Sequence, residues 1–119
     1  MSRTMGLFMA DYDILLLPAV TRPPFKLGTM DTNRNRPRGI DYWLEEMVYY
    51  STQQLFNITG QPAISLPLHW NPDQLPLGVQ LVASIGNDAL LFKIAHQLEQ
   101  ARPWFNKYPP LHITNQGGG

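Results

Sequence analysis

The chain has 119 residues, of which 44% are apolar and 11% aromatic, which is enough for one small domain and excludes a largely disordered chain. Nine basic and nine acidic residues cancel, so the chain lacks the positive field that steers nucleic-acid and anionic-membrane binders. Because there is no cysteine, disulfides, thiolate metal sites and a cysteine nucleophile are excluded, and we expect a soluble, cytoplasmic protein.

The chain opens with an apolar run that includes Met5 and Phe8 and carries no helix start signal, so we expect it to begin inside a truncated helix. Asp11 and Asp13 interrupt the run well before the length of a transmembrane span or a signal core, so no membrane partner is expected. Residues 14–17 then form a continuous apolar run stopped by a proline. This pattern predicts a strand buried on both faces of a parallel or mixed sheet.

Residues 21–38 are rich in proline, glycine, asparagine and arginine and predict a long irregular loop. We interpret its arginines, Arg34, Arg36 and Arg38, as part of a solvated loop in preference to a binding patch. Between residues 40 and 55, apolar side chains recur at three- and four-residue spacing, which predicts one amphipathic helix.

Two strands are predicted next, at residues 63–68 and 77–83, as a hairpin or as neighbours joined by a short polar loop. A second helix follows Gly86 and ends before Pro103, and residues 111–119 are expected to be a disordered glycine tail. This order predicts the α/β class, with three or four strands and two main helices as a fragment of a larger sheet.

The residues show no constellation that would carry catalysis. None of the serines lies in a Gly-rich elbow, and Ser65 is interpreted as a locally bonded strand hydroxyl. Each lysine lies in a predicted loop or on a predicted helix, with no feature that would make it a base. His96 and Glu99 lie three apart on a predicted helix, which favours a surface hydrogen bond over a metal site. From the residues alone, we predict no catalytic residue, no metal site and no cofactor.

One segment carries a specific resemblance. FNITGQPAISLPL at residues 56–68 resembles the amidase signature family near its C-terminus, where a helix ends at an FN-x-TG-x-PA-x-x-x-P pattern. The similarity continues through LPLGVQLVA at residues 75–83 and LEQARPW at residues 98–104, and upstream YDILLLP at residues 12–18 is similar to a family strand. Gln74 stands where the family carries a glycine. Within the family, TGQPAISLPLHW is most similar to bacterial amidases resembling aminohexanoate-oligomer hydrolases.

The resemblance implies that residues 1–119 are a partial amidase domain, the C-terminal portion of a mixed-sheet fold. The complete enzyme would hydrolyse a carboxamide C–N bond through a serine, a cis-serine and a lysine, without metal or organic cofactor. Those residues have no counterpart in this chain, so we predict that the chain alone is inactive. Its partners would be the missing N-terminal region or a complementary chain, together with a small amide substrate. In the complete enzyme the chain would complete the sheet and the pocket wall.

Three hypotheses remain open at this point. The first is a C-terminal amidase piece, arising from a truncated gene, a split subunit or deliberate shortening. The second is a non-catalytic interaction module derived from the fold, and the third is an enzyme that uses its own residues. For the first, the expected substrate contacts are Trp43 and Met47 on the first helix and Trp70 after the strand; the alternative for Trp43 and Met47 is a place in the core at helical spacing.

Overall fold

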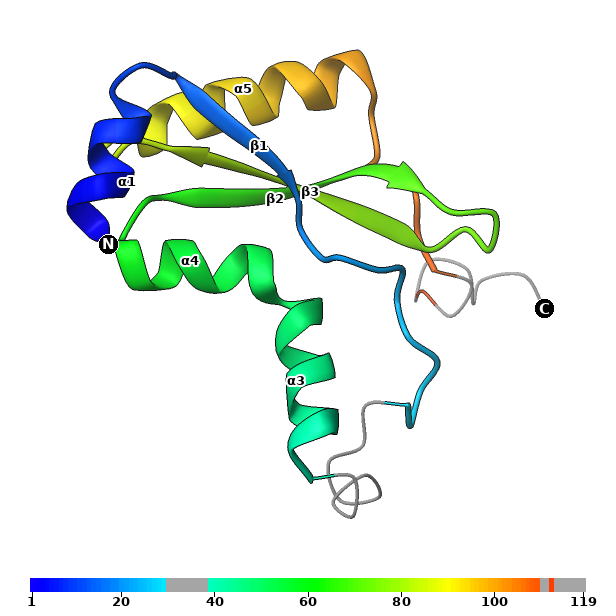
Figure 1. Cartoon of the computed structure of the whole chain (residues 1–119). Coiled ribbons are helices and arrows are strands. Elements are labelled where there is room, and N and C mark those ends of the chain that lie inside the picture. Colours follow the sequence, from blue (N-terminus) through cyan, green and yellow to red (C-terminus); the bar gives the residue numbers. More distant parts are fainter. Residues whose placement is uncertain (30–38, 110–111, 113–119) are drawn as a thin grey trace.

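The computed structural model describes residues 1–29, 39–109 and 112. Within these residues the chain forms helices and strands in the order α1 (Ser2–Met9), β1 (Ile14–Pro18), α3 (Gly39–Tyr49), α4 (Ser51–Thr59), β2 (Ala63–Trp70), β3 (Pro76–Ala83) and α5 (Asp88–Ala101) (Figure 1). Residues 21–29 of the predicted loop form turns and irregular backbone, as expected, whereas its arginines and all of the predicted glycine tail except His112 lie outside the described residues.

The three strands form one sheet in the order β1-β3-β2, and both pairings are antiparallel. Leu81 of β3 lies between Leu16 of β1 and Ile64 of β2. The prediction of one sheet is therefore confirmed, whereas the parallel or mixed pairing expected from residues 14–17 is not found among the described strands. The short connection between β2 and β3 leaves room only for a hairpin, because a parallel pair needs a crossover of a dozen or more residues.

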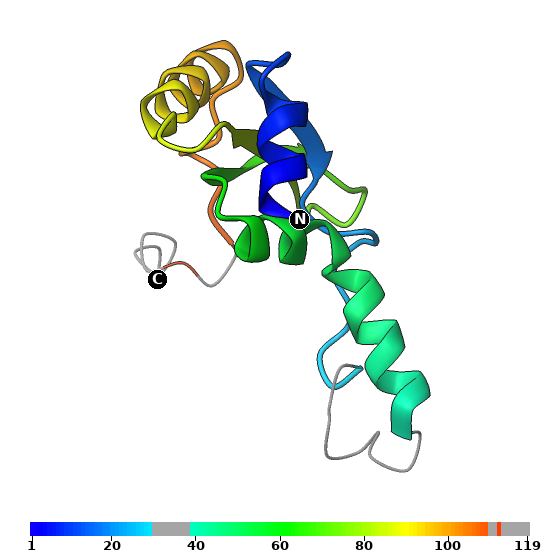
Figure 2. The ribbon, with the colours of Figure 1, turned by 60° about the vertical axis from the view of Figure 1, so that its left-hand side comes forward.

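Helices cover the two faces of the sheet unequally. α5 lies across one face and α4 across the other, with α1 beside α4 (Figures 1 and 2). Under α5, the buried cluster consists of Leu66, Leu81, Ala83 and Leu91. Since side chains alternate along a strand, Gln80 and Val82 point to the α4 side, where Val82 is fully buried. The edge strand β1 is only half-buried, and Leu16 is 63% exposed, so the prediction that it is covered on both faces is wrong for the described residues.

The helix predicted for residues 40–55 is broken in two. Tyr50 separates α3 from α4, with φ −99° and ψ 8°. Side-chain hydroxyls of Thr21 and Ser51 donate to the carbonyl of Val48, at 3.1 Å and 3.0 Å. This carbonyl is thereby satisfied at the end of a helix, which favours a break there. α3 consequently points away from the sheet (Figure 2).

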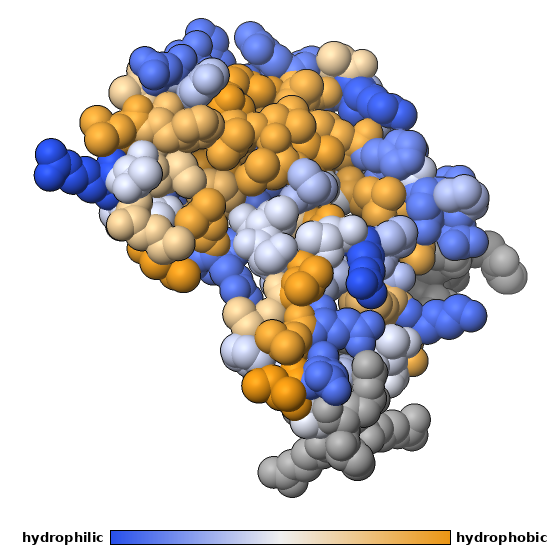
Figure 3. Space-filling model, viewed as in Figure 1, coloured by the Kyte–Doolittle hydropathy of each residue, from blue (hydrophilic) through white to orange (hydrophobic). Residues whose placement is uncertain are grey.

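The break leaves the apolar stripe of α3 largely uncovered. Ile40, Trp43 and Val48 are 68%, 54% and 52% exposed, although their spacing predicts an inward face. The radius of gyration is 17.7 Å, against about 13 Å for a compact domain of this length. The molecule is a slab of 55 × 46 × 21 Å, and apolar surface is open on it (Figure 3).

Two residues at positions of the family pattern, Gly60 and Gln74, have left-handed backbone conformations. Gly60 ends α4 with φ 82°, and its N–H donates to the carbonyl of Phe56 at 2.8 Å, as the TG-x-PA pattern requires of a sharp exit from a helix. Gln74, in the hairpin loop, has φ 60°. It therefore occupies, without being glycine, a conformation that glycine adopts at little cost.

Candidate functional site

The described serines that could serve as nucleophiles are engaged in local structure or exposed. Ser51 and Ser84 donate to the backbone carbonyls of Val48 and Met9. Ser65 is exposed on β2, where it is the register partner of Gln80 on β3. Within residues 1–29, 39–109 and 112, no serine hydroxyl has a hydrogen bond to a lysine or histidine side chain. This part of the chain therefore presents no nucleophile and base in contact.

Charged and metal-binding side chains are also dispersed. The described part of the chain holds no group of three histidine, aspartate or glutamate residues able to bind a metal ion. His69 and His96 are exposed, and His112 stacks on Tyr108 with ring centroids 4.3 Å apart. No helix in this part is both long and apolar enough to cross a bilayer.

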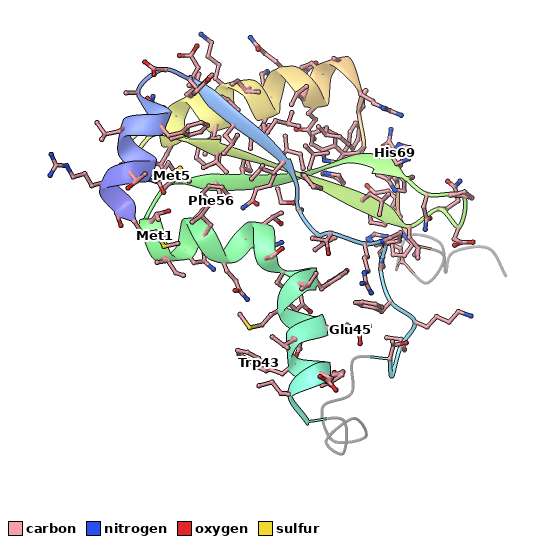
Figure 4. All side chains as sticks on the ribbon, viewed as in Figure 1. Met1, Met5, Trp43, Glu45, Phe56 and His69 are labelled. Atoms are coloured by element: carbon pink, nitrogen blue, oxygen red, sulfur yellow. The ribbon has the colours of Figure 1, made fainter. Side chains whose placement is uncertain are left out.

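The predicted substrate contacts lie in two separate places. Trp43 and Met47 are one turn apart on α3, with Trp43 exposed and Met47 half-buried. Trp70 is half-buried at the end of β2, and the Lys107 ammonium lies 3.9 Å from the centroid of its ring. α3 lies well apart from the end of β2, as the labelled Trp43 and His69 show (Figure 4). The described residues therefore bring Trp43 and Met47 together but do not join them to Trp70 in one pocket.

A contact network holds the segment after β1 to the junction of α3 and α4. The carbonyl of Ala19 accepts from Thr52 Oγ1 at 3.1 Å and from Gln53 Nε2 at 2.9 Å. Phe25 and Tyr49 pack with centroids 4.6 Å apart, and burial, followed by the neighbouring Tyr50, raises the pKa of Tyr49. This network orients α3 relative to the sheet, and with it the side chains that α3 carries.

Hollows open on the described surface, and two of them lie beside the elements that carry this network. The larger, of about 450 Å³, lies between α1, β1 and α4 and is apolar; its lining residues are Met1, Thr4, Met5, Phe8, Leu15 and Leu55. The smaller, of about 200 Å³, lies beside Arg22 and Gly78. No sequence pattern singled out the larger hollow. The apolar run around Met5 forms part of its wall, but the hollow closes only where α4, which is distant in the sequence, packs beside α1 and β1.

Comparisons with known proteins identify the family to which this fold belongs. The family profile described as Amidase matches residues 1–92. The chain is 39% identical over 109 residues to the 6-aminohexanoate-cyclic-dimer hydrolase of Paenarthrobacter ureafaciens, a match that covers 86% of this chain and 21% of that protein. The hydrolase of the same name from Pseudomonas sp. (strain NK87) is 37% identical over 107 residues, with the same coverage.

Solved structures give the same relationship. A structure of 6-aminohexanoate cyclic dimer hydrolase matches with a TM-score of 0.65 and 34% identity, over 87% of this chain and 22% of that one. A glutamyl-tRNA(Gln) amidotransferase structure from Thermotoga maritima matches with a TM-score of 0.64 and 27% identity, over 87% of this chain and 20% of that one. The chain thus spans about a fifth of the length of these relatives. The family profile covers well over half of the chain, and the predicted resemblance is confirmed: this chain belongs to the amidase family.

Proposed function

We propose that this chain acts as the C-terminal portion of an amidase-type hydrolase, which cleaves a carboxamide C–N bond when the rest of the fold is present. The observation that carries the proposal is the match of the Amidase family profile to residues 1–92. The described residues form an open slab and hold no nucleophile paired with a base. The partner is the remaining amidase polypeptide, on the same chain or a separate one. The cysteine-free composition favours a reducing, cytoplasmic setting.

In this proposal the chain contributes strands and pocket wall, while the serine, cis-serine and lysine implied by the resemblance belong to the other portion. Trp43, Met47 and Trp70 are the proposed substrate contacts. Their apolar surfaces suit an amide with a carbon chain, since ligand pockets are lined mainly by apolar and aromatic groups. The Lys107 ammonium over Trp70 adds one positive charge beside that ring, which suits a substrate with an anionic end.

The first test is activity of the chain alone. We expect no hydrolysis of an aryl amide and no acyl transfer to hydroxylamine above background. Ser65→Ala and Ser84→Ala variants serve as controls. Turnover that disappears in either variant would contradict the proposal, because the chain would then carry its own nucleophile; turnover that survives both points to a contaminant or to another mechanism.

The second test asks whether Trp70 contacts the substrate in the complete enzyme. The chain replaces the matching fifth of the Paenarthrobacter hydrolase, and hydrolysis is measured over linear amides of increasing chain length. Trp70→Ala is expected to reduce discrimination between chain lengths by about tenfold, the lower end of the range for losing one methylene contact. Phe105→Ala, which removes an exposed aromatic ring from the same C-terminal region, is the matched control. Unchanged discrimination in Trp70→Ala removes this residue from the site.

A non-catalytic interaction module is the second candidate, favoured by the exposed apolar stripe of α3. Mass spectrometry of the native gene product separates the two. A product near five times the mass of this chain agrees with an amidase portion on one polypeptide. A stable product of this length that pulls down a partner without amidase sequence agrees with the module.

A further inference from the structure

Trp70 reaches its position through a β-bulge in β2. Two residues of β2 lie between Leu66 and His69, whereas only Gly78 lies between their register partners on β3. Pro67 is one of the two, and β2 is an edge strand among the described strands, which is where a sheet tolerates proline. Since side chains alternate along a strand, the extra residue reverses the face to which the following side chains point.

The bulge places Trp70 on the side of the sheet that α4 covers. Its register partner is Pro76, which shares one face of β3 with residues 78, 80 and 82. Val82 is buried on the α4 side, so Trp70 points to that side as well. Leu66, by contrast, belongs to the buried cluster under α5, and Trp70 would share that face if β2 had no extra residue. α4 leads into α3, and both lie on the same side of the sheet (Figure 1).

The Lys107 side chain covers one face of the Trp70 ring. Its ammonium lies 3.9 Å from the ring centroid, within the range of a cation–π contact. The Lys107 N–H donates to the carbonyl of Trp104 at 2.9 Å, and Trp104 packs against the core cluster under α5. The segment after α5 descends past the end of β2 (Figure 1). The backbone of Lys107 is therefore anchored to the core, and its side chain reaches the ring from there.

We propose that Lys107 is a positioning residue, whose ammonium holds the Trp70 ring in one orientation toward the bound amide. The inference rests on the proposed function, in which Trp70 contacts the substrate, and adds the residue that acts through it. Trp70 is half-buried, so its ring keeps rotamer freedom that a contact on one face restricts. The other face then forms a fixed apolar wall, which suits the carbon chain of an amide.

The first measurement follows the ring in the chain of 119 residues. Nuclear magnetic relaxation of the indole nitrogen gives the order parameter of its N–H bond, and a Trp70→Phe variant assigns the signal. Lys107→Met removes the charge and keeps a long side chain, so it should lower this order parameter. Lys107→Arg retains a cation that stacks on aromatic faces and should keep it at the parental value. Lys93→Met, at an exposed lysine of α5, is the matched control and should change nothing.

The second measurement uses the Paenarthrobacter hydrolase in which this chain replaces the matching fifth, with linear amides of increasing chain length. Over neutral amides, Lys107→Met should reduce discrimination between chain lengths by about two- to fivefold, the size expected of an exposed cation–π contact. The loss should appear in KM, with kcat for the shortest amide unchanged, because the ring binds the carbon chain and takes no part in the chemistry. Lys107→Arg should recover the discrimination, and Lys93→Met should retain it.

The two measurements separate this proposal from the proposed function. A lowered order parameter beside an inactive parental chimera sustains the role of Lys107 and counts against the proposed function. An unchanged order parameter in Lys107→Met overturns the positioning role, and so does a freed ring with unchanged discrimination in an active chimera. A loss confined to amides with a carboxylate end also overturns it, because Lys107 would then bind the substrate directly.

Discussion

Gly78 lies in β3 against both Ser65 of β2 and the residue that follows β1, and adding one methyl group there should destabilise the sheet. A Cβ on Gly78 would sit 2.8 Å from Ser65 Oγ and 2.9 Å from Ala19 Cβ, both shorter than real carbon contacts allow. Ser65 is exposed and its hydroxyl can rotate away. Ala19 cannot move easily: its N–H donates to the carbonyl of Gly78 at 2.9 Å, and its own carbonyl accepts from Thr52 and Gln53.

The expected loss follows from these contacts. Overpacking of a rigid site costs about 1–3 kcal/mol. Replacing glycine by alanine recovers about 0.5–1 kcal/mol by reducing the freedom of the unfolded chain. The Gly78→Ala variant should therefore lose about 1–2 kcal/mol of unfolding free energy, which lowers Tm by about 5–10 °C in a domain of about 100 residues.

Thermal unfolding followed by circular dichroism measures this shift. Gly6→Ala is the matched control, because a Cβ at Gly6 meets no atom within 4 Å, and it should not lower Tm. The double variant Gly78→Ala with Ala19→Gly removes the carbon contact and should recover part of the loss. If Gly78→Ala unfolds at the parental temperature, or the double variant is no more stable than the single one, then close packing at Ala19 is not what requires glycine here.

Three further outcomes are expected. Gln74→Gly should raise stability by about 0.5–1 kcal/mol, since φ 60° strains glutamine, and an unchanged urea midpoint would contradict this. Gly60→Ala should lower it by about 1 kcal/mol because φ is 82° at the end of α4; a parental midpoint would show that this exit tolerates a side chain. Burial and then Tyr50 raise the pKa of Tyr49, so the folded chain keeps this proton to higher pH than the unfolded chain. The resulting stability is present below about pH 10 and lost as pH rises through the raised pKa, and Tyr49→Phe should flatten that alkaline decline relative to Tyr108→Phe.

Local sequence patterns predict most of the helices and strands, because backbone preferences and apolar spacing act over a few neighbouring residues. β2 and β3 follow from alternating or continuous apolar runs between breakers, and α5 follows from its apolar spacing and the proline after it. The apolar spacing does not predict the helix break at Tyr50, because one of the two hydroxyls that satisfy the Val48 carbonyl belongs to Thr21, 27 residues away in the sequence. Residue type and position along the chain favour Trp43, Met47 and Trp70 as contacts, but their relative placement depends on that same break.

The family, and the two junctions that define it, can be deduced from local sequence. The FNITGQPAISLPL segment dictates a helix end at Gly60 and a strand after Pro62 through backbone preferences that need no distant partner. Long-range contacts, in contrast, establish the antiparallel pairing of β1 with β3, the outward course of α3 and the hollow beside α1. Each of these features brings together residues far apart along the chain, and such contacts are selected by packing and by hydrogen bonds that no local pattern encodes.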